Sequence, residues 1–465
     1  MTSTPLSHDP GTIRAINPAT GEPLEPLALH GTAEIARRLE RAASAFEEWR
    51  ATPIQERSVR MRALAGHLRA RRDALARTMT LEMGKPITQA EAEVEKCAWA
   101  CEHFADHAGR YLAEELVPSD AARSYTRCDP LGVVLAIMPW NFPLWQVFRC
   151  AAPALMAGNA IVLKHASNVP GCALAIEAVI AESGVPPGLF STLLAPSSAV
   201  AALIADPRIA AISLTGSDAA GRSVAAAAGA ALKKCVMELG GSDAFLVLED
   251  APLEAVAASA VAARVQNNGQ SCIAAKRFLV SDRVAERFEA SFIQRMKALR
   301  VGDPLDRATE VGPLARADLR DTLHAQVTAS VRAGAKLALG GAPLPGPGCW
   351  YAPTVLLGAA PGMSAFDEEL FGPVAAVTRV KDDAHAVELA NRSRYALGAS
   401  VWTGDPARGE RLAAAIAAGS AFVNGIVKSD PRLPFGGIRD SGWGRELGRE
   451  GIREFVNLKT VWVGA

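Results

Sequence analysis

The sequence predicts an α/β protein built on a parallel sheet with crossover helices. Four short runs rich in branched apolar residues have the length and composition of buried strands, at residues 131–137, 160–163, 209–214 and 245–248. Stretches with helical character separate these runs, which is the order expected of strands joined by crossover helices. The chain has 465 residues, 49% of them hydrophobic, and is therefore long enough for more than one packed core.

Helical periodicity is clearest near the N-terminus. Residues 33–49 and 54–83 carry apolar side chains at helical spacing among many arginines and glutamates, which predicts amphipathic surface helices. The Gly/Pro cluster at 340–348 predicts a loop. The alanine-rich stretch at 224–232 is too short and too close to charged residues to span a bilayer, so we expect no membrane segment.

Charge and cysteine usage exclude several classes of protein. The formal net charge is zero, which argues against a nucleic-acid partner. The chain start lacks a charged region followed by an apolar one, and the eight cysteines show no paired framework, so we expect free thiols and a cytoplasmic location. Cys97 and Cys101 have helical i, i+4 spacing without a second ligand pair, so no metal site is expected.

Three short motifs carry residues suited to carbonyl chemistry. Cys272 ends the run Gln-Asn-Asn-Gly-Gln-Ser-Cys, Glu238 lies within Met-Glu-Leu-Gly-Gly, and Asn141 lies within Pro-Trp-Asn-Phe-Pro. A thiol, a carboxylic acid and a carboxamide can attack a carbonyl carbon, move protons and hold an oxyanion. Each also has a plain structural alternative: a buried cysteine, a glutamate beside a turn and an N-capping asparagine.

These motifs resemble those of the aldehyde dehydrogenase superfamily, in the family's order and over nearly the whole chain. The resemblance implies that Cys272 attacks the aldehyde, that hydride leaves to a nicotinamide, and that water hydrolyses the resulting thioester. It implies Asn141 and the backbone N–H of Cys272 as oxyanion donors and Glu238 as general base. Apolar neighbours of Glu238 can move its pKa toward working pH.

The cofactor signal is spread over several places. Residues 215–221, with Gly216, Ser217 and Gly221, follow a predicted strand and open a helix, whose N-terminal N–H groups suit a pyrophosphate, although this is not the G-x-G-x-x-G pattern. By resemblance, Ser217 contacts the pyrophosphate and Lys164 the adenosine ribose. The nicotinamide side is assigned to Glu369 and Phe371, and Trp140 is also expected to bind the cofactor. For Lys164 and Glu369, a solvated charge is the alternative.

One departure from the family pattern concerns cofactor choice. Many NAD-preferring relatives have a Lys-Pro-x-Glu arrangement after this strand, and its acid repels a 2′-phosphate. This chain has Lys164-His-Ala-Ser167 instead. Ser167 can donate to a phosphate oxygen and Lys164 is a cation beside it. We therefore expect NADP to be accepted, alongside or ahead of NAD.

The predicted substrate site lies in the segment after Asn141. A helix opening near Pro143 would place Asn141, Trp145 and Arg149 on one face, at i, i+4 and i+8. An arginine there suits a substrate with a distal carboxylate, with an interdomain salt bridge as the alternative. Gln146 and Ser429 complete the predicted site. The Trp-Gln-x-x-Arg and Lys-His-Ala features resemble those of the short bacterial succinate-semialdehyde dehydrogenases.

Alternatives remain open from sequence. The substrate can be another aldehyde, such as glutarate semialdehyde or an aromatic aldehyde. A CoA-acylating relative would not need Glu238, and a non-catalytic member would be expected to lose Cys272 or Glu238, yet both are present.

Domain limits come from the resemblance alone. It implies a Rossmann-type cofactor domain at 1–112 and 131–238, an α/β catalytic domain at 239–446, and a small β oligomerisation element at 113–130 and 447–465. We expect a homodimer or homotetramer.

Overall fold

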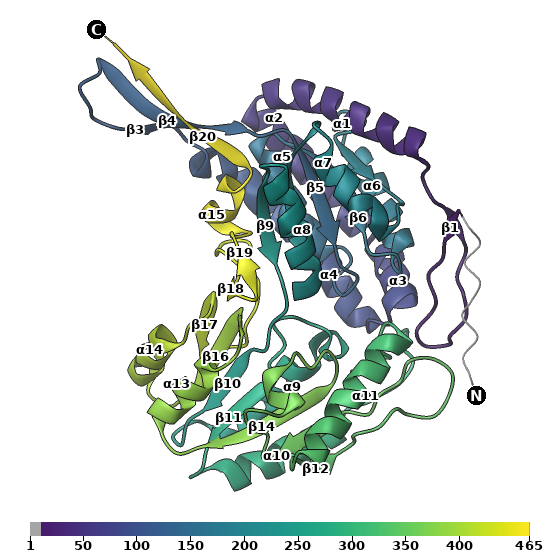
Figure 1. Ribbon diagram of the computed structural model, residues 1–465, viewed down its shortest axis with the longest axis vertical. Helices are drawn as coiled ribbons and strands as arrows, with labels where there is room; N and C mark the ends of the chain where they lie inside the picture. The colour runs from purple at the N-terminus through teal and green to yellow at the C-terminus, as the bar shows by residue number, and fades with distance from the viewer. Residues whose placement is uncertain (1–10, 465) are drawn as a thin grey trace.

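The computed structural model describes residues 11–464 and divides them between two α/β lobes and a projecting β arm (Figure 1). The first lobe holds a six-stranded sheet in the order β19-β9-β8-β5-β6-β7, parallel except for β19. Its strands are β5 (Val133–Met138), β6 (Ala160–His165), β7 (Phe190–Thr192), β8 (Ile209–Thr215), β9 (Lys234–Glu238) and β19 (Gly442–Trp443).

Helices pack around this sheet because its central strands are apolar on both faces. They are α1 (Thr32–Ala51), α2 (Ile54–Ala70), α3 (Arg72–Met83), α4 (Ile87–Tyr111), α5 (Trp145–Ala157), α6 (Pro170–Ala181), α7 (Val200–Ala205) and α8 (Asp218–Ala230). The N-terminal segment, with β1 (Thr12–Ile13) paired to β2 (Leu27–Ala28), runs along one side of the molecule.

The second lobe holds a seven-stranded sheet in the order β12-β13-β14-β11-β10-β16-β17, in which β12 alone is antiparallel. Its strands are β10 (Ala244–Val247), β11 (Arg277–Ser281), β12 (Lys336–Leu339), β13 (Thr354–Leu357), β14 (Val374–Val380), β16 (Gly398–Trp402) and β17 (Ser420–Val423). Its helices are α9 (Leu253–Val265), α10 (Ala285–Lys297), α11 (Ala317–Arg332), α12 (Ser364–Asp367), α13 (Asp383–Asn391) and α14 (Pro406–Ala415). A separate two-stranded antiparallel sheet is formed by β15 (Tyr395–Ala396) and β18 (Ile438–Arg439).

The arm is a three-stranded antiparallel sheet that extends away from the first lobe (Figure 1). It consists of β3 (Glu115–Leu116), β4 (Arg123–Pro130) and β20 (Val456–Val463), the last reached through α15 (Gly448–Arg453). Its apolar side chains are unusually exposed: Leu116 is 73% exposed, Leu458 58% and Trp462 55%. The register places Leu458 and Trp462 on one face of the arm and Leu116 on the other, so both faces carry exposed apolar residues.

The predicted α/β class with parallel sheets is confirmed, and the four predicted strands correspond to β5, β6, β8 and β10. The predicted helix over 54–83 is two helices, because the backbone at Arg71 leaves helical geometry. Gly442 and Trp443, expected in the catalytic segment, pair with β9 of the first lobe. Among the helices of residues 11–464, none has both the length and the apolar character needed to cross a bilayer.

The helix predicted to open at Pro143 begins later, and this corrects one inference. The first helical residue of α5 is Trp145, because the Glu93 carboxylate accepts hydrogen bonds from the backbone N–H groups of Leu144, at 2.9 Å, and Trp145, at 2.8 Å. A carboxylate at a helix start is favourable for both the capping bonds and the helix dipole. Asn141 therefore precedes the helix and does not share a helical face with Arg149.

Candidate active site

Cys272 follows an irregular segment that leaves the end of α9. Asn267, Asn268 and Gly269 all have left-handed backbone conformations, with φ of 54°, 58° and 74°. Asparagine tolerates this region better than most residues. At Gly269 an added Cβ would lie 2.3 Å from the carbonyl oxygen of Gly372, so no larger side chain fits. The Asn-Asn-Gly run thus gives the turn that presents the cysteine.

Buried amides fix this turn to the rest of the molecule. The Asn268 amide donates to the carbonyls of Gly84, at 2.8 Å, and Pro313, at 3.0 Å. The Asn267 amide donates to the carbonyl of Asn141 at 2.6 Å. Buried amides that donate to backbone carbonyls hold the segments they join in fixed positions. The position of Cys272 relative to Asn141 is therefore set by hydrogen bonds between the segments that carry them.

A cavity of about 390 Å³ gathers many of the predicted residues. Its lining includes eight of them: Trp140, Asn141, Gln146, Gly216, Ser217, Cys272, Glu369 and Phe371. The rings of Trp140 and Phe371 meet edge to face with centroids 5.7 Å apart. The cavity thus brings a thiol and a carboxamide together beside an aromatic wall.

Asn141 is 5% exposed, and its amide donates to the Gln270 carbonyl at 3.1 Å. A carboxamide has two N–H groups. This bond orients the amide and leaves the other N–H for an oxyanion formed at Cys272, the arrangement that a preorganised donor requires.

Lys276 is a residue that sequence reasoning missed. Its ammonium is fully buried and donates to the carbonyls of Ser271, at 2.9 Å, and Cys272, at 2.8 Å, while lying 3.3 Å from Glu369. Burial raises the pKa of the Cys272 thiol to about 12, and the charges of Arg149 and Lys276 oppose that rise. The thiol is therefore protonated at neutral pH and must lose its proton as it attacks. The only sequence signal was the pair of basic residues Lys276-Arg277 between two alanines and the apolar run 278–280.

Glu238 ends β9 and is 1% exposed. Burial raises the pKa of this carboxyl well above its usual range, against the charge of Arg149, and Glu446 adds to the rise. One oxygen lies 3.9 Å from an Arg149 nitrogen, and the side chain is not part of the cavity lining. The carboxylate is directed toward Arg149, so a role as base requires it to turn toward Cys272 or to act through water.

Arg149 lies in a buried ion-pair network. It pairs with Glu446, donates to the Thr215 hydroxyl at 3.2 Å, and its guanidinium carbon lies 4.6 Å from the centre of the Phe435 ring. The side chain is 2% exposed and does not line the cavity. These contacts correspond to the ion-pair alternative rather than to a guanidinium free for a substrate carboxylate. Sequence reasoning did not identify Glu446 as the partner of Arg149, because the two residues are far apart in the chain and meet only in the folded protein.

Trp145 and Ser429, also predicted for the substrate, contact each other. The Trp145 indole donates to the Ser429 hydroxyl at 2.9 Å, and both side chains are buried. They lie outside the cavity lining, whereas the neighbouring Gln146 is part of it. The buried Gln146 carbonyl oxygen accepts no hydrogen bond within residues 11–464.

Lys164 and Ser167 line a second cavity of about 490 Å³, which shares Pro139, Thr215 and Gly216 with the first. Burial lowers the pKa of Lys164, and no carboxylate of the described residues pairs with it. Ser217 is the N-cap of α8, and its hydroxyl accepts from the Ala220 N–H at 3.2 Å. A cation, a hydroxyl and a helix N-terminus along joined cavities form a donor set that fits a dinucleotide.

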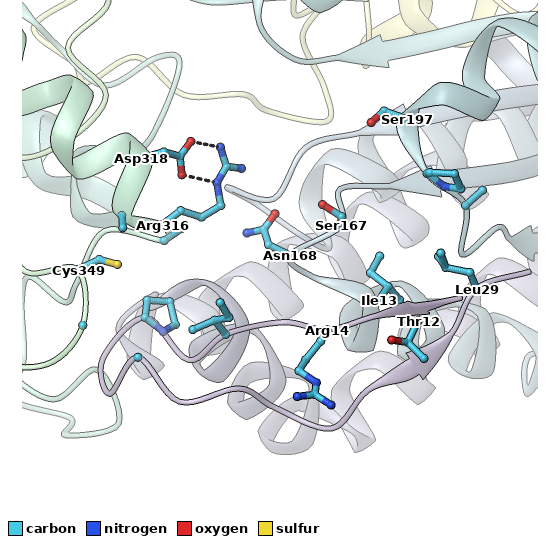
Figure 2. Close-up of a pocket in the computed structure, with 18 of the residues that line it drawn as sticks. Thr12, Ile13, Arg14, Leu29, Ser167, Asn168, Ser197, Arg316, Asp318 and Cys349 are labelled. Carbon is cyan, nitrogen blue, oxygen red and sulfur yellow. Dashed lines mark hydrogen bonds and ion pairs between the residues drawn. The ribbon is translucent and has the colours of Figure 1, made fainter. Parts of the chain in front are cut away.

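A third cavity, of about 790 Å³, continues this path (Figure 2). It shares Ser167, Asn168 and Ser197 with the second cavity and is closed by the N-terminal segment. Arg316 lines all three cavities and pairs with Asp318 through contacts of 2.9 and 2.8 Å (Figure 2).

His165 connects the segment that carries Lys164 and Ser167 to the segment that carries Asn141. Sequence reasoning did not assign this role. Its Nε2–H donates to the Pro143 carbonyl at 2.8 Å, and its Nδ1 accepts from the Ala166 N–H at 2.9 Å. Burial lowers the pKa of this imidazole to about 4, so the ring is neutral. It therefore joins the Lys164–Ser167 segment to the segment that carries Asn141.

The chain is similar to known proteins over nearly its whole length. The sequence model of the aldehyde dehydrogenase family matches residues 6–461. A protein of Synechocystis sp. named probable succinate-semialdehyde dehydrogenase [NADP(+)] is 51% identical, over 97% of this chain and 99% of its own length. The Escherichia coli succinate semialdehyde dehydrogenase [NAD(P)+] Sad is 48% identical over 99% of both chains.

Solved structures give the same result for the fold. The succinic semialdehyde dehydrogenase of Streptococcus pyogenes, solved in complex with NADP+, superposes with a TM-score of 0.95 at 36% identity, over 97% of this chain and 100% of that one. The structure of Gox0499 superposes with a TM-score of 0.96 at 39% identity and the same coverage.

Proposed function

Because this chain belongs to the aldehyde dehydrogenase family, we propose that it oxidises succinate semialdehyde to succinate with NADP or NAD. The near-full-length identity to proteins named for that reaction carries the proposal. The cavity that joins Cys272 and Asn141 supports it, because it supplies a nucleophile and an oxyanion donor to one carbonyl group.

The proposed sequence of steps uses residues of this chain at each point. The Cys272 sulfur attacks the aldehyde carbon while its proton passes to water, and the Asn141 amide with the Cys272 backbone N–H holds the oxyanion. Trp140 and Phe371 line the cavity where a nicotinamide would be held, and that group would supply the hydride acceptor. Glu238 then removes a proton from the water that hydrolyses the thioester, which releases the acid. The retained Glu238 favours hydrolysis over transfer of the acyl group to CoA, and its presence with Cys272 favours an enzyme over a non-catalytic member.

Steady-state kinetics test this function. Succinate semialdehyde, glutarate semialdehyde, butanal and an aromatic aldehyde would each be assayed with NADP and NAD, with and without CoA. We expect the highest kcat/KM for succinate semialdehyde and no dependence on CoA. A higher kcat/KM for an uncharged aldehyde, or a requirement for CoA, would overturn the proposal.

Cofactor choice gives a separate prediction. Ser167→Glu is expected to shift the ratio of kcat/KM values toward NAD, because a carboxylate there accepts from a 2′-hydroxyl but repels a 2′-phosphate. The matched control is Ser291→Glu, on α10 of the second lobe and outside all three cavities. If the ratio in Ser167→Glu stays constant or moves toward NADP, Ser167 does not contact the adenosine ribose.

Arg149→Met is expected to lower kcat/KM for succinate semialdehyde and butanal by the same factor. Removing the guanidinium leaves the Glu446 and Glu238 carboxyls buried without their cation, and breaking a buried pair costs about 3–5 kcal/mol. The thermal midpoint should fall as well. Arg149→Lys, which keeps the charge, is the control. A loss confined to succinate semialdehyde would instead assign Arg149 to the substrate carboxylate.

We further infer that the protein is a homo-oligomer in which the β arm takes part. The exposed apolar side chains of β3 and β20 support this inference. Light scattering gives the mass in solution, and a monomer at assay concentration would contradict it. The cytoplasmic location stays a prediction from the cysteine pattern.

A further inference from the structure

We propose that Lys85 and Glu93, a buried ion pair at the start of α4, are positioning residues that hold Asn141 in place as the oxyanion donor. The proposal rests on the proposed function, because it takes the Asn141 amide as the group that holds the oxyanion formed at Cys272. Neither member of the pair lines the cavity that contains Cys272, so both act through other residues and not on the substrate itself.

The Glu93 carboxylate joins three groups through its two oxygens. One oxygen accepts hydrogen bonds from the backbone N–H groups of Leu144, at 2.9 Å, and Trp145, at 2.8 Å. The other oxygen pairs with the Lys85 ammonium, and both side chains of the pair are buried. The start of α5 is therefore fixed to α4 by a carboxylate that a cation holds in place.

Lys85 also contacts the residue that follows Asn141 in the chain. Its ammonium lies 4.0 Å from the centre of the Phe142 ring, which is a cation–π distance. The next residue is Pro143, whose ring fixes its own backbone φ. The ion pair thus holds the chain at residue 142 and again at residues 144–145, with a stiff residue between. The backbone that carries Asn141 leads directly into this held segment.

The same part of α4 holds the turn that presents the nucleophile. The Gly84 carbonyl accepts from the Asn268 amide at 2.8 Å. The Gln89 side-chain oxygen accepts from the backbone N–H of Asn267 at 2.7 Å. The segment 84–93 therefore contacts both the turn before the thiol and the segment after the amide. An oxyanion donor acts only when its N–H is directed at the place where the charge develops, so this segment sets the geometry on which the donor depends.

A buried ion pair contributes geometry more than stability. Two charges taken out of water are costly, and replacing both with residues of similar volume is often neutral for the free energy of unfolding. Burial lowers the pKa of the Lys85 ammonium, and the charge of Glu93 opposes this change, so the cation depends on its partner. Both members must therefore be replaced together, because one charge left alone in the interior would destabilise the fold.

The test is a double-mutant cycle between the ion pair and Asn141. Lys85→Met/Glu93→Gln removes both charges together, and the glutamine keeps a carbonyl oxygen for the two N–H groups at the start of α5. We expect the single-turnover rate of NADPH formation from succinate semialdehyde to fall about ten- to a hundredfold, because the amide is displaced from the oxyanion. The dissociation constant of NADP should stay within about threefold of the wild type, since no cofactor contact is removed.

Coupling to Asn141 distinguishes positioning from general damage. In the wild type, Asn141→Ala should lower this rate about 10²–10³-fold, which is the effect of one oxyanion donor. In the Lys85→Met/Glu93→Gln background the same change should cost at least about tenfold less, because the amide is already out of place. If the two losses multiply, the pair does not position Asn141. The control is Arg379→Met/Glu289→Gln, an ion pair of the second lobe, which should leave both the rate and the effect of Asn141→Ala unchanged.

The outcomes separate this proposal from the proposed function. If another aldehyde proves to be the substrate, the proposed function fails, and the cycle is run on that aldehyde. If Asn141→Ala keeps the wild-type rate, Asn141 is not the oxyanion donor and this proposal is overturned as well. Should Lys85→Met/Glu93→Gln not fold, Gln89→Ala provides the same cycle, because it removes only the acceptor of the Asn267 N–H. It should also reduce the cost of Asn141→Ala, and an unchanged cost would overturn the proposal.

Discussion

Cys272→Ala is expected to abolish aldehyde oxidation, with kcat reduced about 10⁴-fold or more, while NADP binding stays close to that of the wild type. Removing a covalent nucleophile costs rates of this order, because no other group can form the thiohemiacetal. Cofactor binding should persist because the turn that carries residue 272 is held by Asn267 and Asn268 rather than by the thiol. Activity is measured as NADPH formation, and binding by calorimetry.

Cys128→Ala is the matched control, a half-buried cysteine on β4 of the arm. It should retain full activity, so a loss in both variants would indicate a general effect of removing cysteine. Near-normal turnover in Cys272→Ala would eliminate the covalent mechanism and with it the assignment of Asn141 as oxyanion donor.

The local features of this fold were predictable from sequence because they depend on residues close in the chain. Branched apolar runs identified the strands, since a buried parallel strand is apolar on both faces. The turn before Cys272 could also be predicted from its Asn-Asn-Gly run, because asparagine and glycine adopt left-handed backbone conformations more easily than other residues. Both kinds of signal act within a few residues.

The contacts around the predicted substrate residues were not predictable, because they join residues far apart in the chain. Glu93 on α4 sets the start of α5, and that start removed the shared helical face proposed for Asn141 and Arg149. Glu446 neutralises Arg149, and Ser429 meets Lys96. Each pair joins segments that meet only in the folded molecule, so an arginine that looked suited to a substrate proved to have a protein partner.

The same network explains why Glu238 is poised as a base rather than permanently ionised. Its carboxyl is buried against Arg149 with Glu446 close by, so it releases its proton only above the usual range for a glutamate. A base acts in its ionised form. The hydrolytic step should therefore slow as the pH falls through this raised pKa, and it should be fastest above it.

Glu238→Gln is expected to slow thioester hydrolysis much more than hydride transfer. Glutamine keeps the shape of the side chain but cannot take a proton from water. Mixing enzyme, NADP and aldehyde should then give a rapid burst of NADPH, near one equivalent per active site, followed by a steady rate lowered about 10²–10⁴-fold. The acid-side fall of the steady rate should disappear in this variant, because the titrating group is gone. Glu289→Gln, on a distant helix of the second lobe, is the control and should behave as wild type. A variant without a burst, with its defect confined to hydride transfer, would mean that Glu238 serves the attack of Cys272 and that another group activates the water.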